Sequence, residues 1–256
     1  MITDKRSGKP IVKARHIKRL AREIASVYFD GVHRSRSPLI LLYGAGSFGH
    51  PLAHRYKLSG RALSPNVIVG MAKIVSAVHQ LGGALTNIFL SEGIPVVPLQ
   101  TSALVRQQKG KLVVTNYSLI EDILSHGGVP LLGGDVIIAD RRHTVIVSAD
   151  RLAAKFVRHF HSRKLLFATD VNGVYKKFPV QTRERPLNVI SRKELKNILI
   201  TQAVQNNALD VTGAMVGKLR ALLSLRKCTV FIFNGLRRGV LTKVLHDGAQ
   251  GTRIIL

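Results

Sequence analysis

The sequence is poor in cysteine, tryptophan and acidic residues, and each scarcity excludes a class of protein. A single cysteine, Cys228, cannot form an internal disulfide, and within the apolar residues 228–233 it is expected to be a buried thiol on a strand. No apolar run reaches transmembrane length, and the polar, basic residues 1–19 contain no cleavable signal. We therefore expect a cytoplasmic protein without a membrane anchor. Tryptophan is absent and aromatic residues make up 5%, which leaves few surfaces for stacking nucleobases.

The shortage of acidic residues gives the chain an extreme charge. Lys and Arg number 39 against 14 Asp and Glu, so the formal net charge is +25. Such a surface attracts polyanions, of which nucleic acid is the most obvious. The basic residues are spread along the chain, however, with no basic tail and no RNA-binding signature. We attribute the charge partly to an anionic ligand and partly to the source organism, and treat nucleic acid as an unfavoured alternative.

Glycines are concentrated directly after an apolar run at residues 39–43. Gly44, Gly46 and Gly49 lie within six positions and are followed by His50. This pattern predicts a strand buried in the core, a tight turn and a helix start, which together suit an anion. The spacing also matches a dinucleotide fingerprint, but the first acidic residue after Gly44 is Glu92, too far for a ribose ligand. A phosphate cradle or a simple strand–helix turn remain as alternatives.

Strands and helices are expected to alternate along the rest of the chain. Pro10 is expected to open a helix and Ser64-Pro65 a long apolar one to about Ser91. Strands are expected at 94–99, 111–115, 129–132, 136–139, 144–147, 165–168, 228–233 and 251–256, and helices at 118–126, 149–161, 192–200 and 210–225. Further glycine-polar turns follow strands at 133–135 and 169–173, and another opens the helix at 210–218. The alternation predicts an α/β fold with a largely parallel central sheet.

Four of these segments together resemble the amino acid kinase superfamily, and within it the isopentenyl phosphate kinases. The sequence Gly44-Ala45-Gly46-Ser47-Phe48-Gly49-His50 is similar to the family's Gly-Gly-Gly-Ser-Phe-Gly-His. Gly134-Asp135-Val136, residues 169–175 and residues 210–213 resemble its later signatures, in the same order. The resemblance implies an open α/β/α sandwich of two closely joined lobes, with residues 1–163 binding the phosphate acceptor and residues 164–256 binding ATP.

The resemblance also implies an activity and a set of site residues. The reaction would be phosphorylation of isopentenyl phosphate by ATP with Mg²⁺, by in-line transfer and without a metal site built from protein side chains. His50 would hold the acceptor phosphate, and the long apolar helix would line the isoprenoid pocket. The remaining acceptor-side residues would be Gly44, Ala45, Gly46, Gly49, Gly134 and Asp135; the ATP-side residues would be Lys5, Asp170, Gly173, Val174, Tyr175, Gly213 and Lys218. Asp150 would organise the catalytic lysines Lys5 and Lys218, or serve only as a helix N-cap.

One departure from the family pattern predicts a missing segment. The family carries a strand with Lys-x-Gly-Gly-Ser directly before Ile-Thr-Asp-Lys, whereas Met1 directly precedes Ile2-Thr3-Asp4-Lys5 here. We hypothesise that Met1 is an internal start and that about ten more residues are encoded upstream, judging from the length of a strand plus loop. An upstream in-frame stop codon without that motif would contradict this.

Two other functions are weighed against the isopentenyl phosphate kinase assignment. A fosfomycin-type kinase shares the phosphate-binding histidine, and a non-catalytic descendant could bind nucleic acid through the basic surface. The long apolar helix favours an isoprenoid acceptor, and the retained charged residues favour catalysis. Members of the family are commonly homodimers, which the sequence does not test.

Overall fold

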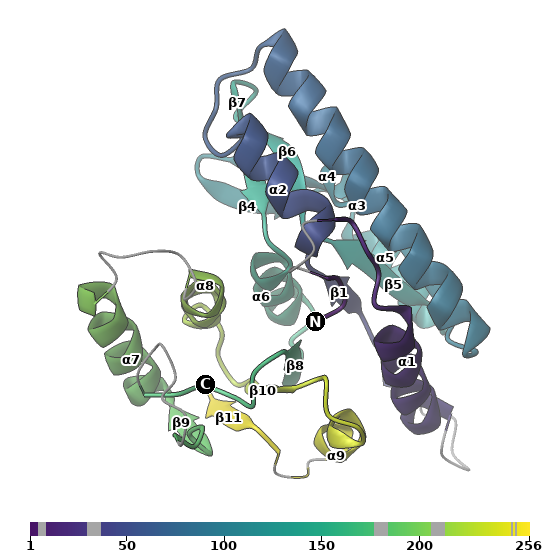
Figure 1. The fold of residues 1–256 in the computed structure, drawn as a ribbon, viewed down its shortest axis with the longest axis vertical. Helices are drawn as coiled ribbons and strands as arrows, with labels where there is room; N and C mark the ends of the chain where they lie inside the picture. Colours follow the sequence, from purple (N-terminus) through teal and green to yellow (C-terminus); the bar gives the residue numbers. More distant parts are fainter. Residues whose placement is uncertain (5–8, 30–36, 177–183, 206–212, 247, 249) are drawn as a thin grey trace. The chain divides into compact units, whose positions relative to one another are not determined.

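The computed structural model describes residues 1–4, 9–29, 37–176, 184–205, 213–246, 248 and 250–256. The chain divides into two compact units, one formed by Ile2–Leu152 and the other by Ala153–Leu256 together with Met1 (Figure 1). The division falls inside helix α6 (Ala149–His159), whereas the sequence places the boundary after that helix, between residues 163 and 164. Below, Ile2–Leu152 is called the N-terminal unit and Ala153–Leu256 the C-terminal unit.

The N-terminal unit is built on a parallel sheet in the order β1-β5-β2. Its strands are β1 (Leu41–Tyr43), β5 (Val129–Gly133) and β2 (Val96–Leu99). Strand β5 is buried at every position, as expected for a central parallel strand covered on both faces. Strand β1 is only half-buried, so the prediction that this strand is buried in the core is wrong. The physical reason is its place at an edge of this sheet.

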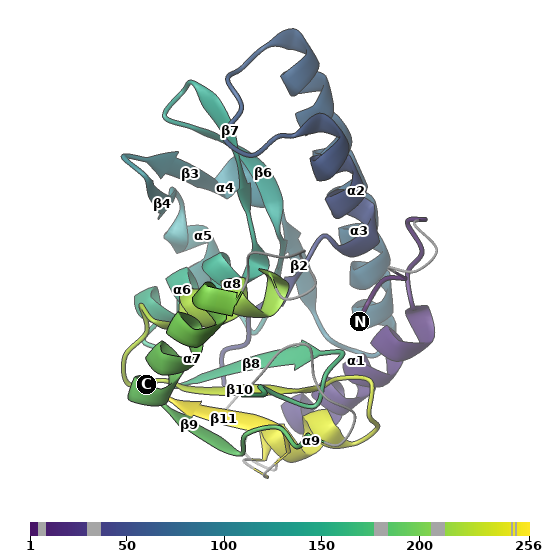
Figure 2. The same cartoon turned by 60° about the vertical axis from the view of Figure 1, so that its left-hand side comes forward.

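Helices cover this sheet, and the longest of them matches its prediction. Helix α3 (Pro65–Ser91) begins after Ser64, whose side chain accepts a hydrogen bond from the Val67 N–H, and has proline in its first turn. It lies on one face of the sheet and α5 (Tyr117–Ser125) on the other (Figure 2). Its buried side chains join two hydrophobic clusters, one around Leu81 and Leu85 and one around Ile74 and Val78. Among the described residues α3 is the one helix long and apolar enough to cross a membrane, a test that a core helix also passes.

The first helix starts later than expected. Helix α1 (Ala14–Phe29) begins four residues after Pro10, the predicted start. The intervening segment is extended, because Val12 pairs with Thr3 in an antiparallel bridge. Hydrogen bonds from Asp4 N to Ile11 O and from Lys13 N to Ile2 O flank this bridge at 3.0 and 2.9 Å. Long-range backbone pairing here overrides the local preference for a helix.

A second sheet in the N-terminal unit has the order β4-β3-β6-β7. It consists of two antiparallel hairpins, formed by β3 (Val105–Gln108) with β4 (Lys111–Val114) and by β6 (Asp135–Ala139) with β7 (His143–Val147). Strand β3 and the short helix α4 (Thr101–Leu104) were not predicted. The sequence of β3 has a single apolar residue and therefore little strand signal.

The C-terminal unit contains a mixed sheet in the order β8-β10-β11-β9. Its strands are β8 (Lys164–Thr169), β10 (Thr229–Asn234), β11 (Thr252–Ile255) and β9 (Val189–Ser191), the last not predicted. Helices α7 (Arg192–Gln205) and α8 (Gly213–Leu222) lie on one face, and α9 (Val240–Leu245) lies on the other (Figures 1 and 2). The buried Cys228 directly precedes β10. The predicted α/β class is confirmed, with antiparallel hairpins added to the parallel sheet.

Candidate active site

The predicted glycine turn connects β1 to helix α2 (Gly46–Tyr56). Gly46 has a φ of +51°, a conformation that favours glycine. Ala45, which stands where the related motif has glycine, has a φ of −62°, so a side chain is tolerated there, as expected. Gly44 is exposed, and a Cβ added to it would meet nothing within 4 Å. The turn is therefore open to solvent on the side of Gly44.

The backbone donors of this turn suit an anionic ligand. None of the hydrogen bonds between described residues engages the N–H groups of Gly44, Ala45 or Gly46. The next N–H group, that of Ser47, donates to the Thr3 hydroxyl at 3.1 Å. The donors stand at the N-terminal end of α2, where the helix dipole also favours negative charge. This geometry supports the predicted phosphate cradle.

A second glycine turn lies directly beside the first. The Gly134 N–H donates to the Tyr43 carbonyl at 2.8 Å, which joins the ends of β5 and β1. A Cβ at Gly134 would lie 3.1 Å from Val147 O and 3.2 Å from Ala149 N. The β5–β6 turn therefore packs closely against the start of α6, and a side chain at Gly134 would require the neighbouring backbone to shift. Two of the turns predicted from sequence thus meet at the carboxyl ends of neighbouring parallel strands, where α/β folds bind ligands.

Asp135 is part of the framework behind these turns. Its carboxylate is 4% exposed and accepts hydrogen bonds from Ser102 N at 3.0 Å and Val136 N at 2.8 Å. Burial raises the pKa of this carboxyl above its ordinary value, although the hydrogen bonds oppose the shift. Burial and the Asp135 charge together raise the pKa of Tyr43 to about 12. Both oxygens of Asp135 are thus held by the protein's own backbone, a geometry that suits a supporting role.

His50 and Asp150 lie near the starts of two helices. His50 is exposed on α2, one turn beyond Gly46. Asp150 is half-buried in the first turn of α6. Ser148 supplies the side-chain cap of that helix, accepting a hydrogen bond from the Arg151 N–H at 3.3 Å. The alternative that Asp150 is the N-cap is therefore wrong, because Ser148 occupies that position.

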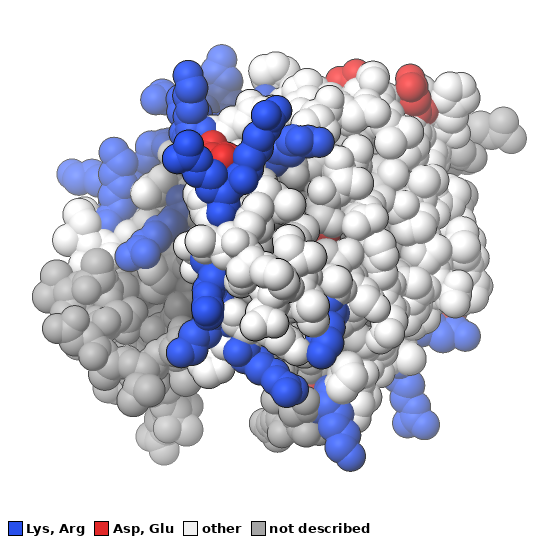
Figure 3. All heavy atoms as spheres, turned by 90° about the horizontal axis from the view of Figure 1, so that it is seen from above, with Lys and Arg blue, Asp and Glu red and all other residues white. Residues whose placement is uncertain are grey.

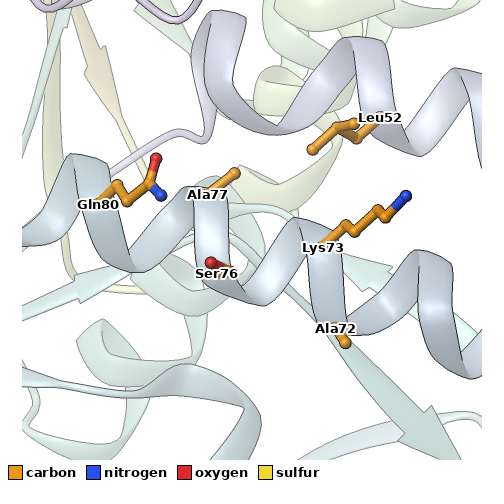
Figure 4. Close-up of a pocket in the computed structure, with 6 residues that line it drawn as sticks. All are labelled: Leu52, Ala72, Lys73, Ser76, Ala77 and Gln80. Carbon is orange, nitrogen blue, oxygen red and sulfur yellow. The ribbon is translucent and has the colours of Figure 1, made fainter.

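A groove runs between α2 and α3 (Figure 4). Its volume is about 450 Å³, and its lining combines Leu52, Ala72 and Ala77 with Lys73, Ser76 and Gln80. Leu52 lies two positions after His50 on the same helix. Lys73 donates a hydrogen bond to the Tyr56 hydroxyl at 2.9 Å. An apolar surface thus begins on the same helix as the predicted phosphate ligand.

Basic side chains gather at the hairpin end of the N-terminal unit. Three turns meet there, because Gly60 N donates to Thr144 O at 2.8 Å and Asp140 N to Gln107 O at 3.0 Å. The exposed cations on these turns are Lys57, Arg61, Lys109, Lys111, Arg141 and Arg142. The acidic residue Asp140 directly precedes the last two. The view in Figure 3 shows Lys and Arg side chains far outnumbering Asp and Glu. The resulting positive field attracts phosphorylated ligands.

The predicted ATP-side residues fall into two groups in the C-terminal unit. Val174 and Tyr175 are buried, and the Val174 N–H donates to the Thr252 hydroxyl at 2.8 Å. A Cβ at Gly173 would lie 2.5 Å from the same hydroxyl, so this segment requires glycine for packing. Asp170 by contrast is exposed directly after β8. The side chains of Val174 and Tyr175 therefore belong to the core, whereas the Asp170 side chain is accessible to a ligand.

Lys218 lies on α8 above strand β8. Its ammonium nitrogen is 4.0 Å from the centroid of the Phe167 ring, within the range of a cation–π interaction. Gly213 forms the first residue of α8. Lys5 lies outside the described residues. Among the described residues, no three His, Cys, Asp or Glu side chains are grouped so that they could hold a metal ion.

Two residues that shape this site were not predicted from the sequence. Thr3, which is 2% exposed, binds the start of α2, and Tyr43 fills the space beside Gly82 and Gly133. A threonine near the N-terminus carries no pattern that would indicate such a contact. The Tyr43 position was assigned to the strand but not to the site.

Comparison with known proteins decides the family. A model of the amino acid kinase family matches residues 2–234. This chain belongs to the amino acid kinase family. An isopentenyl phosphate kinase of Methanothermobacter thermautotrophicus is 33% identical over 99% of this chain and 95% of its own length. The isopentenyl phosphate kinase of Methanocaldococcus jannaschii is 29% identical over 95% of this chain and 91% of its own length.

Solved structures of the amino acid kinase family agree. An isopentenyl phosphate kinase crystal structure matches with a TM-score of 0.80 and 30% identity, covering 99% of this chain and 95% of the other. Membership of the amino acid kinase family confirms the predicted fold class and the predicted enzyme class, a phosphotransferase that uses ATP. The roles of individual site residues stay predictions.

Proposed function

We propose that this protein transfers the terminal phosphoryl group of ATP to isopentenyl phosphate and so forms isopentenyl diphosphate. The observation that carries the proposal is the glycine turn with three consecutive N–H groups, followed one turn later by exposed His50. An acceptor that is itself a phosphate needs such donors, since its phosphate must be neutralised before a second anion approaches. The similarity to isopentenyl phosphate kinases over almost the whole chain supports the same acceptor.

In this proposal the N-terminal unit binds and orients the acceptor. The N–H groups of Gly44, Ala45 and Gly46 and the His50 imidazole hold the acceptor phosphate, with Gly49 and Gly134 allowing the close approach of backbone. Gly49 is buried, and a Cβ there would lie 2.6 Å from the Ala45 Cβ. The apolar side of the α2–α3 groove, including Leu52, receives the isoprenoid tail. Asp135 holds the second glycine turn in place.

The C-terminal unit supplies the nucleotide side. Lys218 contacts the transferring phosphoryl group, and Asp170, which follows β8, contacts the nucleotide. The segment around Gly173, Val174 and Tyr175 gives the backbone its shape, and Gly213 keeps its predicted role toward ATP. Lys5, which precedes this unit in the chain, also keeps its predicted role toward the ATP phosphates. Asp150, which is not the N-cap of α6, keeps its predicted role of organising Lys5 and Lys218. Mg²⁺ would enter with ATP, held mainly by the oxygens of the ATP phosphates. Transfer is in-line and depends on positioning and charge neutralisation.

An acceptor panel tests this proposal. The protein is incubated with Mg-ATP and either isopentenyl phosphate, fosfomycin or N-acetylglutamate, and phosphorylated products are followed by ³¹P NMR. We expect turnover with isopentenyl phosphate and a kcat/KM at least a hundredfold lower with the other two. Preference for fosfomycin would favour the antibiotic kinase, which the relatives do not support.

The nucleic-acid alternative has its own readout. Salt-sensitive binding of random RNA with no turnover of any acceptor would support it. We also expect the family's homodimer and a cytoplasmic location, to be checked by light scattering and by fractionation of cells.

A further inference from the structure

Thr3 reaches the start of α2 across a large separation in sequence. Its hydroxyl accepts the Ser47 N–H at 3.1 Å, a contact between residues 44 positions apart. The helix has no side-chain cap of its own, because Ala45 occupies the N-cap position. The N–H groups of Phe48 and Gly49 both donate to the Ala45 carbonyl. Among these first-turn donors, Ser47 N–H is the one satisfied from outside the turn.

The same side chain also packs beside Gly46, the residue of the turn that has a positive φ. A Cβ at Gly46 would lie 2.2 Å from the Thr3 hydroxyl oxygen and 3.0 Å from its methyl carbon. Gly46 has a φ of +51°, and Thr3 fills the space that the missing side chain leaves. Contact with Thr3 therefore fixes both the direction of the Ser47 N–H and the conformation of Gly46.

Thr3 is itself held firmly. It is 2% exposed, and its pairing with Val12 fixes its backbone. Ile2 packs against the cluster that contains Phe48, which is a residue of α2. The Ser47 hydroxyl beside it is buried and has no hydrogen-bond partner among the described residues. A shift of this turn would thus disturb the packing around the buried hydroxyls of Thr3 and Ser47.

We propose that Thr3 is a positioning residue for the acceptor phosphate, acting through Ser47 and Gly46. The Thr3 hydroxyl accepts the Ser47 N–H, so this donor of the helix is satisfied within the protein. The N–H groups of Gly44, Ala45 and Gly46 remain for the ligand. The inference rests on the proposed function, since it assigns the glycine turn to the acceptor. Thr3 does not touch the reacting atoms.

The test uses three threonine variants. Thr3→Val keeps the shape but removes the acceptor for Ser47 N–H, and Thr3→Ser keeps the hydroxyl. Thr144→Val is the matched control, because Thr144 is also fully buried in the N-terminal unit and its hydroxyl donates to Leu58 O. We expect Thr3→Val to raise the KM for isopentenyl phosphate about tenfold and to leave the KM for ATP unchanged. Thr3→Ser should restore the KM to within twofold.

The control separates positioning from folding. Thr144→Val should lower the melting temperature. It should not change the KM for isopentenyl phosphate relative to the KM for ATP. Equal KM values in Thr3→Val and the parent protein, or parallel changes in both KM values, would overturn the inference.

A second readout needs no turnover. Amide chemical shifts of Gly44, Ala45 and Gly46 are followed during titration with inorganic phosphate. Thr3→Val should weaken this response about tenfold, and Thr3→Ser should not. If the parent protein phosphorylates no acceptor, the proposed function fails. An unchanged phosphate response in Thr3→Val contradicts the role of Thr3.

Discussion

Gly134 donates its backbone N–H to the carbonyl of Tyr43 at 2.8 Å and so joins the carboxyl ends of two neighbouring parallel strands. The hydrogen bond places the two glycine turns of the N-terminal unit side by side. The turn after β1 supplies backbone donors that have no partner among the residues the structure describes, and the turn after β5 packs on the start of α6. A substitution at Gly134 should therefore affect both packing and the acceptor site.

Gly134→Ala should destabilise the protein. Its Cβ would lie 3.1 Å from Val147 O and 3.2 Å from Ala149 N, and these backbone atoms move less readily than the end of a side chain. We expect a loss of about 1–3 kcal/mol in the free energy of unfolding, measured with urea. Gly44→Ala is the control for stability, because a Cβ there meets nothing; it should change the free energy by less than about 0.5 kcal/mol. Equal stability of the two variants would contradict the packing of this turn.

Two adjacent glycines of α3 should respond in opposite directions. A Cβ at Gly82 would lie 2.4 Å from the Tyr43 hydroxyl, whereas one at Gly83 would face open space. Gly83→Ala should stabilise the helix by up to about 1 kcal/mol through its higher helix propensity. Gly82→Ala should destabilise the protein by about 1–3 kcal/mol, because Tyr43 must move. Urea midpoints that shift in the same direction for both would contradict the placement of Tyr43.

Helices and strands were predicted correctly from the sequence where the local signal was strong. Helix α3 has a capping serine, a first-turn proline and a long apolar pattern, and its predicted span was correct. The extended segment before α1, by contrast, depends on pairing between Thr3 and Val12, which local propensity does not reveal. Strand β3 was not predicted for a similar reason. Its polar sequence forms a strand because it pairs with β4 and β6.

Within the site, the glycine turns could be predicted and their supporting contacts could not. Gly44, Gly46 and Gly134 could be predicted because glycines that directly follow apolar runs indicate turns. The contact between Thr3 and Ser47 spans 44 positions and needs the folded chain. The burial of Asp135, Val174 and Tyr175 likewise became visible only through packing.

Lys218 should matter for catalysis more than for stability. Lys218→Met removes the charge above Phe167, an interaction worth roughly 0.5–1 kcal/mol at a partly exposed position. We expect kcat to fall at least a hundredfold, because the transferring phosphoryl group loses its cation. Arg220→Met, an exposed position two residues further on α8, should retain activity. Equal kcat values for the two variants would contradict the role of Lys218.

Cys228 should be inert in the folded protein. Burial raises the pKa of its thiol to about 11 from a usual value of 9.0. Because the folded pKa is the higher one, the thiol's contribution to stability is present below pH 9.0 and is lost as the pH rises toward 11. Ellman's reagent at pH 8 should label it at the rate of unfolding, and Cys228→Ala should reduce the loss of stability between pH 9 and 11. Labelling within seconds would contradict the burial.

A comparison of two histidine variants tests whether His50 and the glycine turn bind a phosphate acceptor. The parent protein, His50→Ala and His54→Ala are assayed for isopentenyl diphosphate formation, His54 being an exposed histidine one turn further along the same helix. We predict product formation by the parent, a fall of at least a hundredfold in kcat/KM for isopentenyl phosphate in His50→Ala, and an unchanged KM for ATP. His54→Ala should retain the parent's activity. Undiminished transfer by His50→Ala, or no transfer by the folded parent protein, would contradict the account.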